Sequence, residues 1–383
     1  MRVSVSNRAR GLTLGGMVRR MAVKALSRTN PNDDDGATRA GGERHVTIDE
    51  VALAAGVSAA TVSRVVNGNP NVRVDAKRGV ERAIAKLGYV PNPAARSLAT
   101  RRSDYIGVVI PEPTSLLFGD PFFPRLLRGI GAALSSRDLQ LVLLMPQSPR
   151  EESRVERYLT AGHVDGALLV SLHGDDPLPA HLAKRRVPAV IGGRPPRGAA
   201  VSYVDVDNEE GARSAVEHLV ARGRRRIGTI TGPLDMAPSI DRLTGYRQAL
   251  GAAGVQADED LQAVGDFTQQ GGASAMRRIL EARPDVDAVF AASDLMAAGA
   301  MQVLRAAGRR IPEDVAIAGF DDSPVAEMTD PPLTSVRQPI EEMGREMVRL
   351  LLEHTADPGS VPRKVILATE LVPRRSSEGV ARR

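Results

Sequence analysis

Residues 46–67 (VTIDEVALAAGVSAATVSRVVN) constrain the fold most, because they predict two short helices joined by a tight turn. Thr47 and Glu50 form a capping box, in which the two side chains satisfy backbone N–H groups at the start of a helix. Gly56 supplies the backbone freedom for the turn, and Ser58 is expected to cap the second helix. This pattern is typical of a helix-turn-helix that binds DNA. An ordinary helical hairpin is the alternative.

The outward face of the second helix carries small, hydroxylated and cationic side chains. Val62, Val65 and Val66 fall on its buried face, which leaves the other residues outside. Such a surface suits close approach to base edges and phosphates. The DNA contacts predicted in this segment are Thr47, Ser58, Ala59, Ala60, Thr61, Ser63, Arg64 and Asn67.

A third helical pattern, from about Asp75 to Leu87, completes a three-helix core and is followed by GYVPNPAARSLATRRS. Pro91 and Pro93 break the chain, so a further short helix can begin only after them. In that helix Leu98 stands among alanines, which suits a wedge pushed between base steps of the minor groove. A plain interdomain linker with an exposed leucine is the alternative. The DNA contacts predicted here are Asn92, Ala95, Arg96 and Leu98.

The charge is unevenly distributed along the chain. Residues 1–104 contain 18 Lys and Arg and 9 Asp and Glu, whereas the remaining residues contain 33 and 37. The basic part carries the helix-turn-helix, as expected for a polyanionic partner. The absence of cysteine excludes disulfides and zinc-thiolate sites. Because we find neither an 18-residue apolar span nor a signal-peptide core, we expect a cytoplasmic, nucleoid-associated protein with no membrane partner.

After residue 104, apolar runs alternate with amphipathic helices. The runs are IGVVIP, LQLVLLM, DGALLVS and PAVIGG, followed by RIGTITG, LQAVGDF, VDAVFAAS and DVAIAGF. This alternation predicts an α/β fold of parallel strands with crossover helices. Ligands of open parallel sheets bind beyond the carboxyl ends of the strands, so site residues are sought there. The polar residues at those positions are Ser171, Asp266, Ser293, Asp294, Asp321 and Asp322.

A chain of 383 residues exceeds what one hydrophobic core organises, so we expect two or three domains. The first segment lacks periodicity and is basic, which predicts a disordered extension. The expected organisation is a disordered basic extension (1–45), a helix-turn-helix head (46–90), a hinge helix and linker (91–104), a two-lobed core (105–375) and a flexible tail (376–383).

These motifs, in this order, resemble the lactose and galactose repressor (LacI/GalR) family of bacterial transcriptional regulators. The resemblance covers about residues 46–375 and includes VTIDEVALAAGVSAATVSRVVNG, LGYVPNPAARSLAT, DPFFPRLLRGI, DRLTGYRQAL, ASDLMAAGAM, IPEDVAIAGFDD and PPLTSVRQP. It implies a small all-α head and a two-lobed, periplasmic-binding-protein-like core of parallel sheets. It also implies a homodimeric repressor of double-stranded operator DNA, controlled by a small effector, expected to be a sugar, between the lobes.

The resemblance further implies which residues contact the effector. Arg242 matches the arginine that holds a ligand oxygen, and Asp321 matches the opposing acidic residue; such a pair can clamp vicinal hydroxyls. The other implied contacts are Phe122, Phe123, Ser171, Arg194, Phe267 and Ser293. Ser293 departs from the asparagine often present in sugar-responsive members, which weakens any claim about a particular sugar. A regulator that responds to a nucleoside or other non-sugar ligand is the alternative. Pairing of Arg242 with Asp241 or Asp235, and turn capping by Asp321, are the structural alternatives.

Several other polar residues are given structural roles. Asn208 is assigned to helix initiation, Gly211 to close packing and Asp294 to capping of the helix that follows it. The segment LTSVRQP, which contains Arg337 and Pro339, is expected to return the chain between the lobes as a hinge.

Enzymatic chemistry is not predicted. The sequence contains neither a GxxxxGK[ST] phosphate loop nor a GxSxG elbow, and GIGAAL at 129–134 falls inside an expected helix. The six histidines show no metal-ligand spacing, and we expect neither metal nor cofactor. A solute-binding receptor without DNA function is the remaining rival, and the helix-turn-helix in place of an export signal argues against it.

Overall fold

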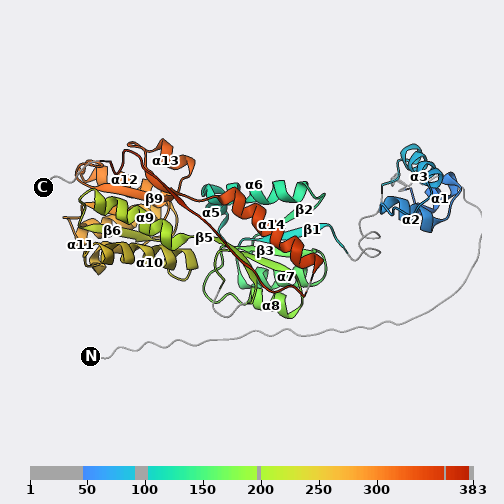
Figure 1. Cartoon of the computed structure of the whole chain (residues 1–383), viewed down its shortest axis with the longest axis horizontal. Coiled ribbons are helices and arrows are strands. Elements are labelled where there is room, and N and C mark those ends of the chain that lie inside the picture. Colours follow the sequence, from blue (N-terminus) through green and yellow to red (C-terminus); the bar gives the residue numbers. More distant parts are fainter. Residues whose placement is uncertain (1–45, 91–101, 196–199, 358, 379–383) are drawn as a thin grey trace, which may run out of the picture. The chain divides into compact units, whose positions relative to one another are not determined.

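The computed structural model describes residues 46–90, 102–195, 200–357 and 359–378 (Figure 1). The predicted extension at 1–45 lies outside these residues. So does the predicted hinge helix, with Asn92, Ala95, Arg96 and Leu98. Among the described residues, no helix combines the length and apolar composition needed to cross a membrane.

The head consists of the three predicted helices, α1 (Ile48–Ala55), α2 (Ala59–Val66) and α3 (Val74–Leu87). The capping box is present: the Thr47 backbone N–H donates to Glu50 Oε2 at 2.8 Å, and the Glu50 N–H donates to Thr47 Oγ1 at 3.3 Å. Gly56 adopts φ +65° in the turn, and Ser58 Oγ accepts from the Thr61 N–H at 3.2 Å. Val62 is fully buried. The local sequence signals of the head are therefore confirmed.

The core contains two six-stranded sheets, each covered by helices on both faces (Figure 1). The first sheet, in the N-lobe, has the order β11-β5-β4-β3-β1-β2, and its strands are parallel. Its strands are β1 (Tyr105–Val109), β2 (Gln140–Leu144), β3 (Gly166–Val170), β4 (Ala189–Gly192), β5 (Ser202–Val206) and β11 (Lys364–Leu367). Its helices are α5 (Thr114–Gly119), α6 (Phe122–Ser135), α7 (Pro149–Thr160), α8 (Leu178–Lys184) and α14 (Ile340–Ala356).

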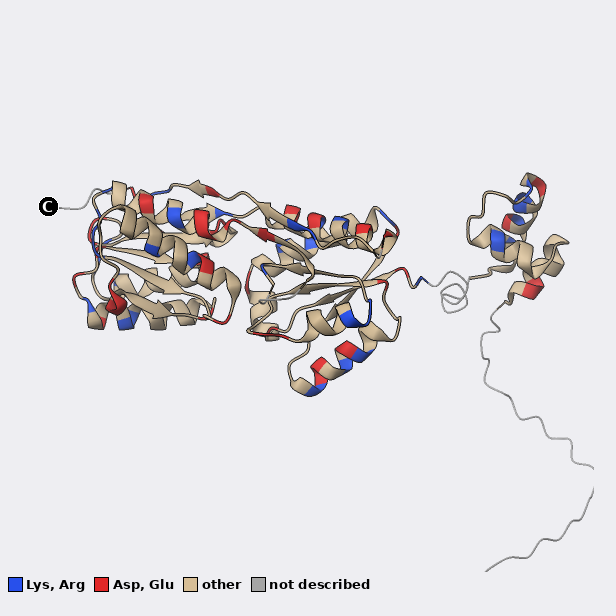
Figure 2. Ribbon diagram, turned by 60° about the horizontal axis from the view of Figure 1, so that its bottom comes forward, with Lys and Arg blue, Asp and Glu red and all other residues tan. Residues whose placement is uncertain are grey.

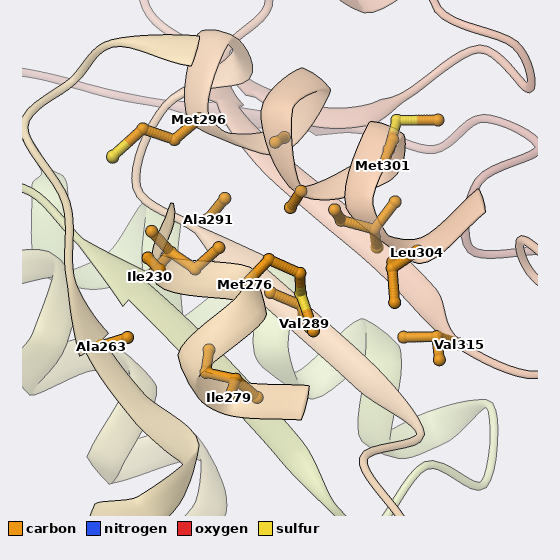
Figure 3. Packing of buried hydrophobic residues seen from close by; sticks show 14 of the residues in the cluster. Ile230, Ala263, Met276, Ile279, Val289, Ala291, Met296, Met301, Leu304 and Val315 are labelled. Atoms are coloured by element: carbon orange, nitrogen blue, oxygen red, sulfur yellow. The ribbon is translucent and has the colours of Figure 1, made fainter. Parts of the chain in front are cut away.

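The second sheet, in the C-lobe, has the order β12-β10-β9-β8-β6-β7, with β12 antiparallel to β10. Its strands are β6 (Ile227–Thr231), β7 (Gln262–Val264), β8 (Ala288–Ala291), β9 (Ala316–Asp321), β10 (Thr334–Arg337) and β12 (Glu370–Val372). Its helices are α9 (Asn208–Ala221), α10 (Ala237–Ala252), η1 (Glu259–Leu261), α11 (Gln269–Ala282), α12 (Asp294–Ala306) and α13 (Pro324–Met328). Figure 3 shows Met276, Val289 and Leu304 in the apolar layer between this sheet and α11 and α12.

The chain passes between the lobes three times: after β5, before α14, and between β11 and β12. The middle passage follows β10, where the segment LTSVRQP was expected to return the chain. These passages place the carboxyl ends of both parallel sheets next to the same interlobe space, where ligands of such sheets bind.

Three expectations need correction. Helices α10 and α11 were expected over Ile240–Ala253 and Gly272–Ala282, and each begins three residues earlier. Pro238 suits a first helical turn, and Thr268 caps α11 by accepting from the Gly271 N–H. The predicted flexible tail at 376–383 begins too early. Ser376 and Ser377 are fully buried, and Ser376 Oγ accepts from the Thr334 N–H and donates to the Ile317 carbonyl.

Candidate functional site

A cavity opens between the two lobes at the carboxyl ends of their strands. The N-lobe contributes residues that follow β1, β3, β4 and β5, and the C-lobe contributes the start of α10 and the ends of β7 and β9. Seven of the eight predicted effector contacts line it, namely Phe122, Phe123, Ser171, Arg194, Arg242, Phe267 and Asp321. The fold therefore brings together side chains that lie 200 residues apart in the sequence.

Arg242 and Asp321 lie at the centre of this site. Arg242 is 6% exposed; its Nε donates to Asn208 Oδ1 at 2.8 Å, and its Nη1 donates to the Ala292 carbonyl at 2.5 Å. Nη1 also lies 3.9 Å from Asp321 Oδ1, and the guanidinium sits 3.7 Å from the ring centroid of Phe320. These contacts fix the direction of the guanidinium.

Neither structural alternative for Arg242 is observed. Asp241 pairs instead with Arg194, through Nη2–Oδ1 at 2.5 Å, and Asp235 contacts His173 at 3.0 Å. Burial lowers the pKa of Arg242, but an arginine stays charged at physiological pH. Arg242 is thus a permanent positive charge inside the cavity.

Three further buried carboxylates, which the sequence patterns did not single out, line the cavity. Glu112 is 5%, Asp120 8% and Asp205 5% exposed, and all three line the same space as Asp321. Burial raises the pKa of Asp120 and of Asp205 to about 6, and burial also raises the pKa of Asp321 well above its ordinary value. The lining is therefore rich in hydrogen-bond acceptors, which suits a ligand rich in hydroxyl donors.

Three lining residues occupy left-handed backbone conformations that non-glycine residues rarely adopt. They are Ser171 (φ +59°), Phe267 (φ +62°) and Asp321 (φ +111°), each at the end of a strand or just after it. Such strain collects at functional sites, where the surrounding fold holds it in place. Gly232 makes room for Phe267, because a Cβ at Gly232 would lie 2.1 Å from the phenyl Cζ.

Aromatic rings form the apolar side of the cavity. Phe122 and Phe123 meet edge to face with 5.3 Å between ring centroids, and Phe267 lines the cavity from the C-lobe. Carboxylates and guanidinium on one side and aromatic faces on the other form the kind of lining that holds a ring bearing hydroxyl groups.

The second candidate surface is the outward face of α2 in the head. Of the eight contacts predicted in the head, five are exposed and three are half-buried. The exposed ones are Thr47, Ser58, Ala60, Arg64 and Asn67, and the half-buried ones are Ala59, Thr61 and Ser63. Ser58 Oγ lies 3.0 Å from Thr61 Oγ1, so two hydroxyls hold each other at the start of this helix. Basic and acidic residues both occur on the head and along the helices of the core (Figure 2).

Comparison with known proteins decides the family. Residues 47–92 match the model "Bacterial regulatory proteins, lacI family", and residues 216–377 match a periplasmic binding protein-like domain. The HTH-type transcriptional regulator CelR of Thermobifida fusca is 52% identical over 336 residues, which cover 87% of this chain and 98% of CelR. The chain belongs to the LacI family. The HTH-type transcriptional repressor CytR of Escherichia coli K12 is 36% identical over 81% of this chain and 90% of CytR.

Solved structures of LacI-family proteins agree with the fold. The CelR–cellobiose complex has a TM-score of 0.70 and 50% identity, and the match covers 87% of this chain and all of the chain in that structure. A lac repressor dimer bound to operator and the anti-inducer ONPF has a TM-score of 0.77 and 28% identity, and the match covers 87% of this chain and 99% of the lac repressor chain. The family and the fold class implied by the motifs are confirmed, and the protein is a DNA-binding transcriptional regulator. CelR and CytR are named as transcriptional regulators as well.

Three side chains of this LacI-family core do not lie as the sequence suggested. Ser293 does not line the cavity: it is 2% exposed and caps α12 by accepting from the Met296 N–H. Asp294 is therefore not the cap, and its carboxylate accepts from the Ser323 N–H at 2.7 Å instead. Asn208 does not merely start α9, because it lines the cavity and holds Arg242.

The assignment of Gly211 to close packing fits the LacI-family core well. A Cβ at this position would lie 2.9 Å from Phe320, the ring beneath Arg242. The signal for Glu112 was available in the sequence, since this residue follows the first predicted strand directly. The same rule that selected Ser171 would have selected it.

Proposed function

We propose that the protein is a homodimeric transcriptional repressor whose affinity for operator DNA is controlled by a neutral sugar, with cellobiose as the first candidate, bound between the lobes. The observation that carries this proposal is the opposed pair of Arg242 and Asp321 in a buried, carboxylate-rich cavity. Cellobiose is the ligand of the CelR complex, whose protein is 50% identical to this chain.

The charge of the cavity supports a neutral ligand. Four carboxylates line it against two guanidinium groups, and both guanidinium groups are engaged by the protein itself. Arg242 donates to Asn208 and to a backbone carbonyl, and Arg194 pairs with Asp241. A phosphate or carboxylate on the ligand would meet acidic side chains with no free cation among these residues to compensate. Hydroxyl groups, in contrast, donate to carboxylates.

Each lining residue has a proposed role. Arg242 and Asp321, which lie side by side with Nη1 3.9 Å from Oδ1, bind adjacent hydroxyl groups, since a guanidinium donates and a carboxylate accepts. Phe122, Phe123 and Phe267 cover the apolar face of the sugar ring, and Ser171 and Arg194 add polar contacts at the rim. The set now also includes Glu112, Asp120 and Asp205 as acceptors; Ser293 is left out because of its capping role.

DNA binding is proposed to use the exposed face of α2, with Arg64 as its cationic contact and the hydroxyl groups near Ser58 as donors. The wedge at Leu98 and the neighbouring contacts at Asn92, Ala95 and Arg96 remain predictions, since they lie outside the described residues. A dimer presents two heads to a near-palindromic operator. This role places the protein in the cytoplasm, where the operator is found.

The test is a fluorescence-anisotropy titration of the purified protein on labelled DNA from upstream of its own coding sequence. The ligands are cellobiose, glucose, a sugar phosphate and cytidine, each at saturating concentration. We expect cellobiose to change the DNA dissociation constant by about 5- to 150-fold, the usual range of such coupling. The sugar phosphate should have no effect. A response to cytidine alone would replace the sugar by a nucleoside, and the absence of DNA binding would refute the proposal.

The matched variants lie on one helix. Arg242→Met removes the buried guanidinium of α10, and we expect it to abolish the cellobiose response while preserving DNA binding. Arg247→Met removes an exposed arginine of the same helix and should behave as the wild type. A normal response in Arg242→Met would exclude that residue from the ligand site.

A further inference from the structure

A single histidine contacts carboxylates from both lobes at the edge of the cavity. His173 follows β3 in the N-lobe, and its Nε2 lies 3.1 Å from Oε1 of Glu112 in the same lobe. Its Nδ1 lies 3.0 Å from Oδ2 of Asp235, which belongs to the C-lobe segment before α10. The backbone joins the same contact, because the Gly174 N–H donates to the Asp235 carbonyl at 2.9 Å. The imidazole therefore bridges the lobes.

The bridge requires a charged imidazole. A neutral imidazole has one N–H donor and can donate to only one of the two carboxylates, whereas an imidazolium donates to both. The charged groups that face this ring are Glu112 and Asp235. The hydrogen bond to Glu112, above all, raises the pKa of His173 to about 9. At neutral pH the bridge is accordingly intact, and it loses one of its two donors as the pH rises above about 9.

The bridge also fixes a residue that lines the cavity. Glu112 Oε1 accepts from Ser171 Oγ at 2.5 Å in addition to its contact with His173. Two contacts on Oε1 restrict the rotation of this carboxylate, which lines the cavity. Since Glu112 is only 5% exposed, its orientation decides which hydroxyl direction the cavity accepts.

A second interlobe contact lies close to the first. Arg194, after β4, pairs with Asp241 on α10 through Nη2–Oδ1 at 2.5 Å and Nε–Oδ2 at 3.2 Å. Asp235 and Asp241 flank the segment that leads into Arg242. The N-lobe thus holds the start of α10 at two points, and that start carries the central ligand contact.

We propose that His173 is a positioning residue for the effector: as an imidazolium it joins the lobes over the cavity and orients Glu112 toward the ligand. The proposal rests on the proposed function in one respect, the presence of a ligand in this cavity. It adds a consequence that a purely structural histidine would not have. Closure of the lobes and retention of the ligand should both weaken above about pH 9.

The first experiment needs no ligand. Because the chain contains no cysteine, Arg154→Cys on α7 and Arg277→Cys on α11 give one exposed spin-label site in each lobe. Pulsed electron paramagnetic resonance then measures the distribution of interlobe distances in the full-length protein. At pH 7.5 we expect His173→Ala to shift this distribution toward longer distances. The doubly labelled protein that keeps His173 should show the same shift at pH 10. An unchanged distribution in His173→Ala would overturn the proposal.

The matched control is His181→Ala. His181 also contacts a carboxylate, Glu156 at 3.1 Å, but both residues belong to the N-lobe. Its removal should leave the distances and their pH dependence unchanged. If His181→Ala widened the distribution as much as His173→Ala, the effect would be nonspecific and the bridge would be rejected.

The second experiment measures cellobiose binding by calorimetry at pH 7.5 and pH 10. Loss of a charge-assisted hydrogen bond predicts weakening of about ten-fold or more for the wild type between these pH values. His173→Ala should bind weakly at both, with a flat profile, whereas His181→Ala should follow the wild type. A His173→Ala profile equal to that of the wild type refutes the positioning role. If the wild type does not bind cellobiose, the proposed ligand fails, while the spin-label distances still decide the interlobe bridge.

Discussion

Replacing Asp205 by asparagine should make the protein more stable and its ligand binding weaker. Asp205 is 5% exposed, and its Oδ1 accepts from the Val206 N–H at 2.8 Å and from Asn208 Nδ2 at 3.0 Å. An amide oxygen can accept both bonds, so the substitution removes a buried charge and keeps these two partners; it weakens the contact with the Arg194 backbone N–H, which favours the ionised form. The Asp205 carboxylate is also a proposed hydrogen-bond acceptor for the effector. The substitution should therefore change protein stability and ligand affinity in opposite directions.

The size of the effect follows from the pKa of Asp205, which burial raises from 3.8 to about 6. One pKa unit corresponds to about 1.4 kcal/mol, so the ionised group costs about 3 kcal/mol of folding free energy. Below pH 4 the carboxyl is protonated in both states and the cost is absent. Between pH 4 and 6 the unfolded chain loses its proton first, so stability falls as the pH rises; above pH 6 the cost is complete.

Urea unfolding at pH 4, 6 and 7.5 tests this reasoning. We expect Asp205→Asn to raise the free energy of unfolding of the core by about 1–3 kcal/mol at pH 7.5 and to match the wild type at pH 4. Asp175→Asn, an exposed substitution in the same lobe, should be neutral at every pH. If the stabilisation did not vary with pH, or if the variant were less stable than the wild type at pH 7.5, the buried charge of Asp205 would not be what lowers the free energy of unfolding.

Four further substitutions test other parts of the molecule. Arg64→Ala should weaken operator binding and lower the slope of log affinity against log salt by about one, measured by anisotropy at several salt concentrations. Gly245→Ala would place a Cβ 2.1 Å from the Glu209 carbonyl, so we expect a loss of about 1–3 kcal/mol in thermal or urea unfolding. Gly251→Ala, in the same helix with open space around it, should instead gain up to about 1 kcal/mol. Ser293→Ala should cost about 1 kcal/mol of stability through its lost cap and leave effector affinity unchanged, measured by calorimetry.

Local signals predicted the elements that depend on neighbours in sequence. The capping box at Thr47 and the glycine turn at Gly56 involve residues three or four apart, so the helices of the head follow from the sequence. The alternation of apolar runs and amphipathic helices likewise predicted eight of the twelve strands in the described core. Four strands were missed: β5 because SYVDV mixes apolar and polar residues, β11 and β12 because they are short and partly exposed, and β10 because its segment LTSVRQP was given a hinge role.

The contents of the cavity depend on distant parts of the chain meeting, which periodicity does not encode. Asp205 lies on the missed strand β5, and its burial arises from packing of the lobes rather than from any local pattern. Helix α14 returns to the N-lobe from the far end of the chain, and a Cβ at Gly129 would lie 2.1 Å from the Glu341 carbonyl on it. The cap of α12 is Ser293, one residue before the expected cap Asp294, so Ser293 has a structural role in place of the expected ligand contact.

The charge distribution of the cavity explains why closure should depend on the ligand. Asp120 belongs to the N-lobe and Asp321 to the C-lobe, yet repulsion from Asp120 contributes to the raised pKa of Asp321. Glu112 contributes in the same way to the raised pKa of Asp120. Closing the lobes over an empty cavity therefore brings like charges together, and Arg242 at the centre offsets this repulsion in part. Ligand hydroxyl groups donate to these carboxylates and favour their charged forms. The free-energy cost of closing the lobes is therefore lower when the cavity is occupied than when it is empty. The coupling between ligand and lobe closure thus originates in repulsion between buried carboxylates of the two lobes, which contact with ligand hydroxyl groups offsets.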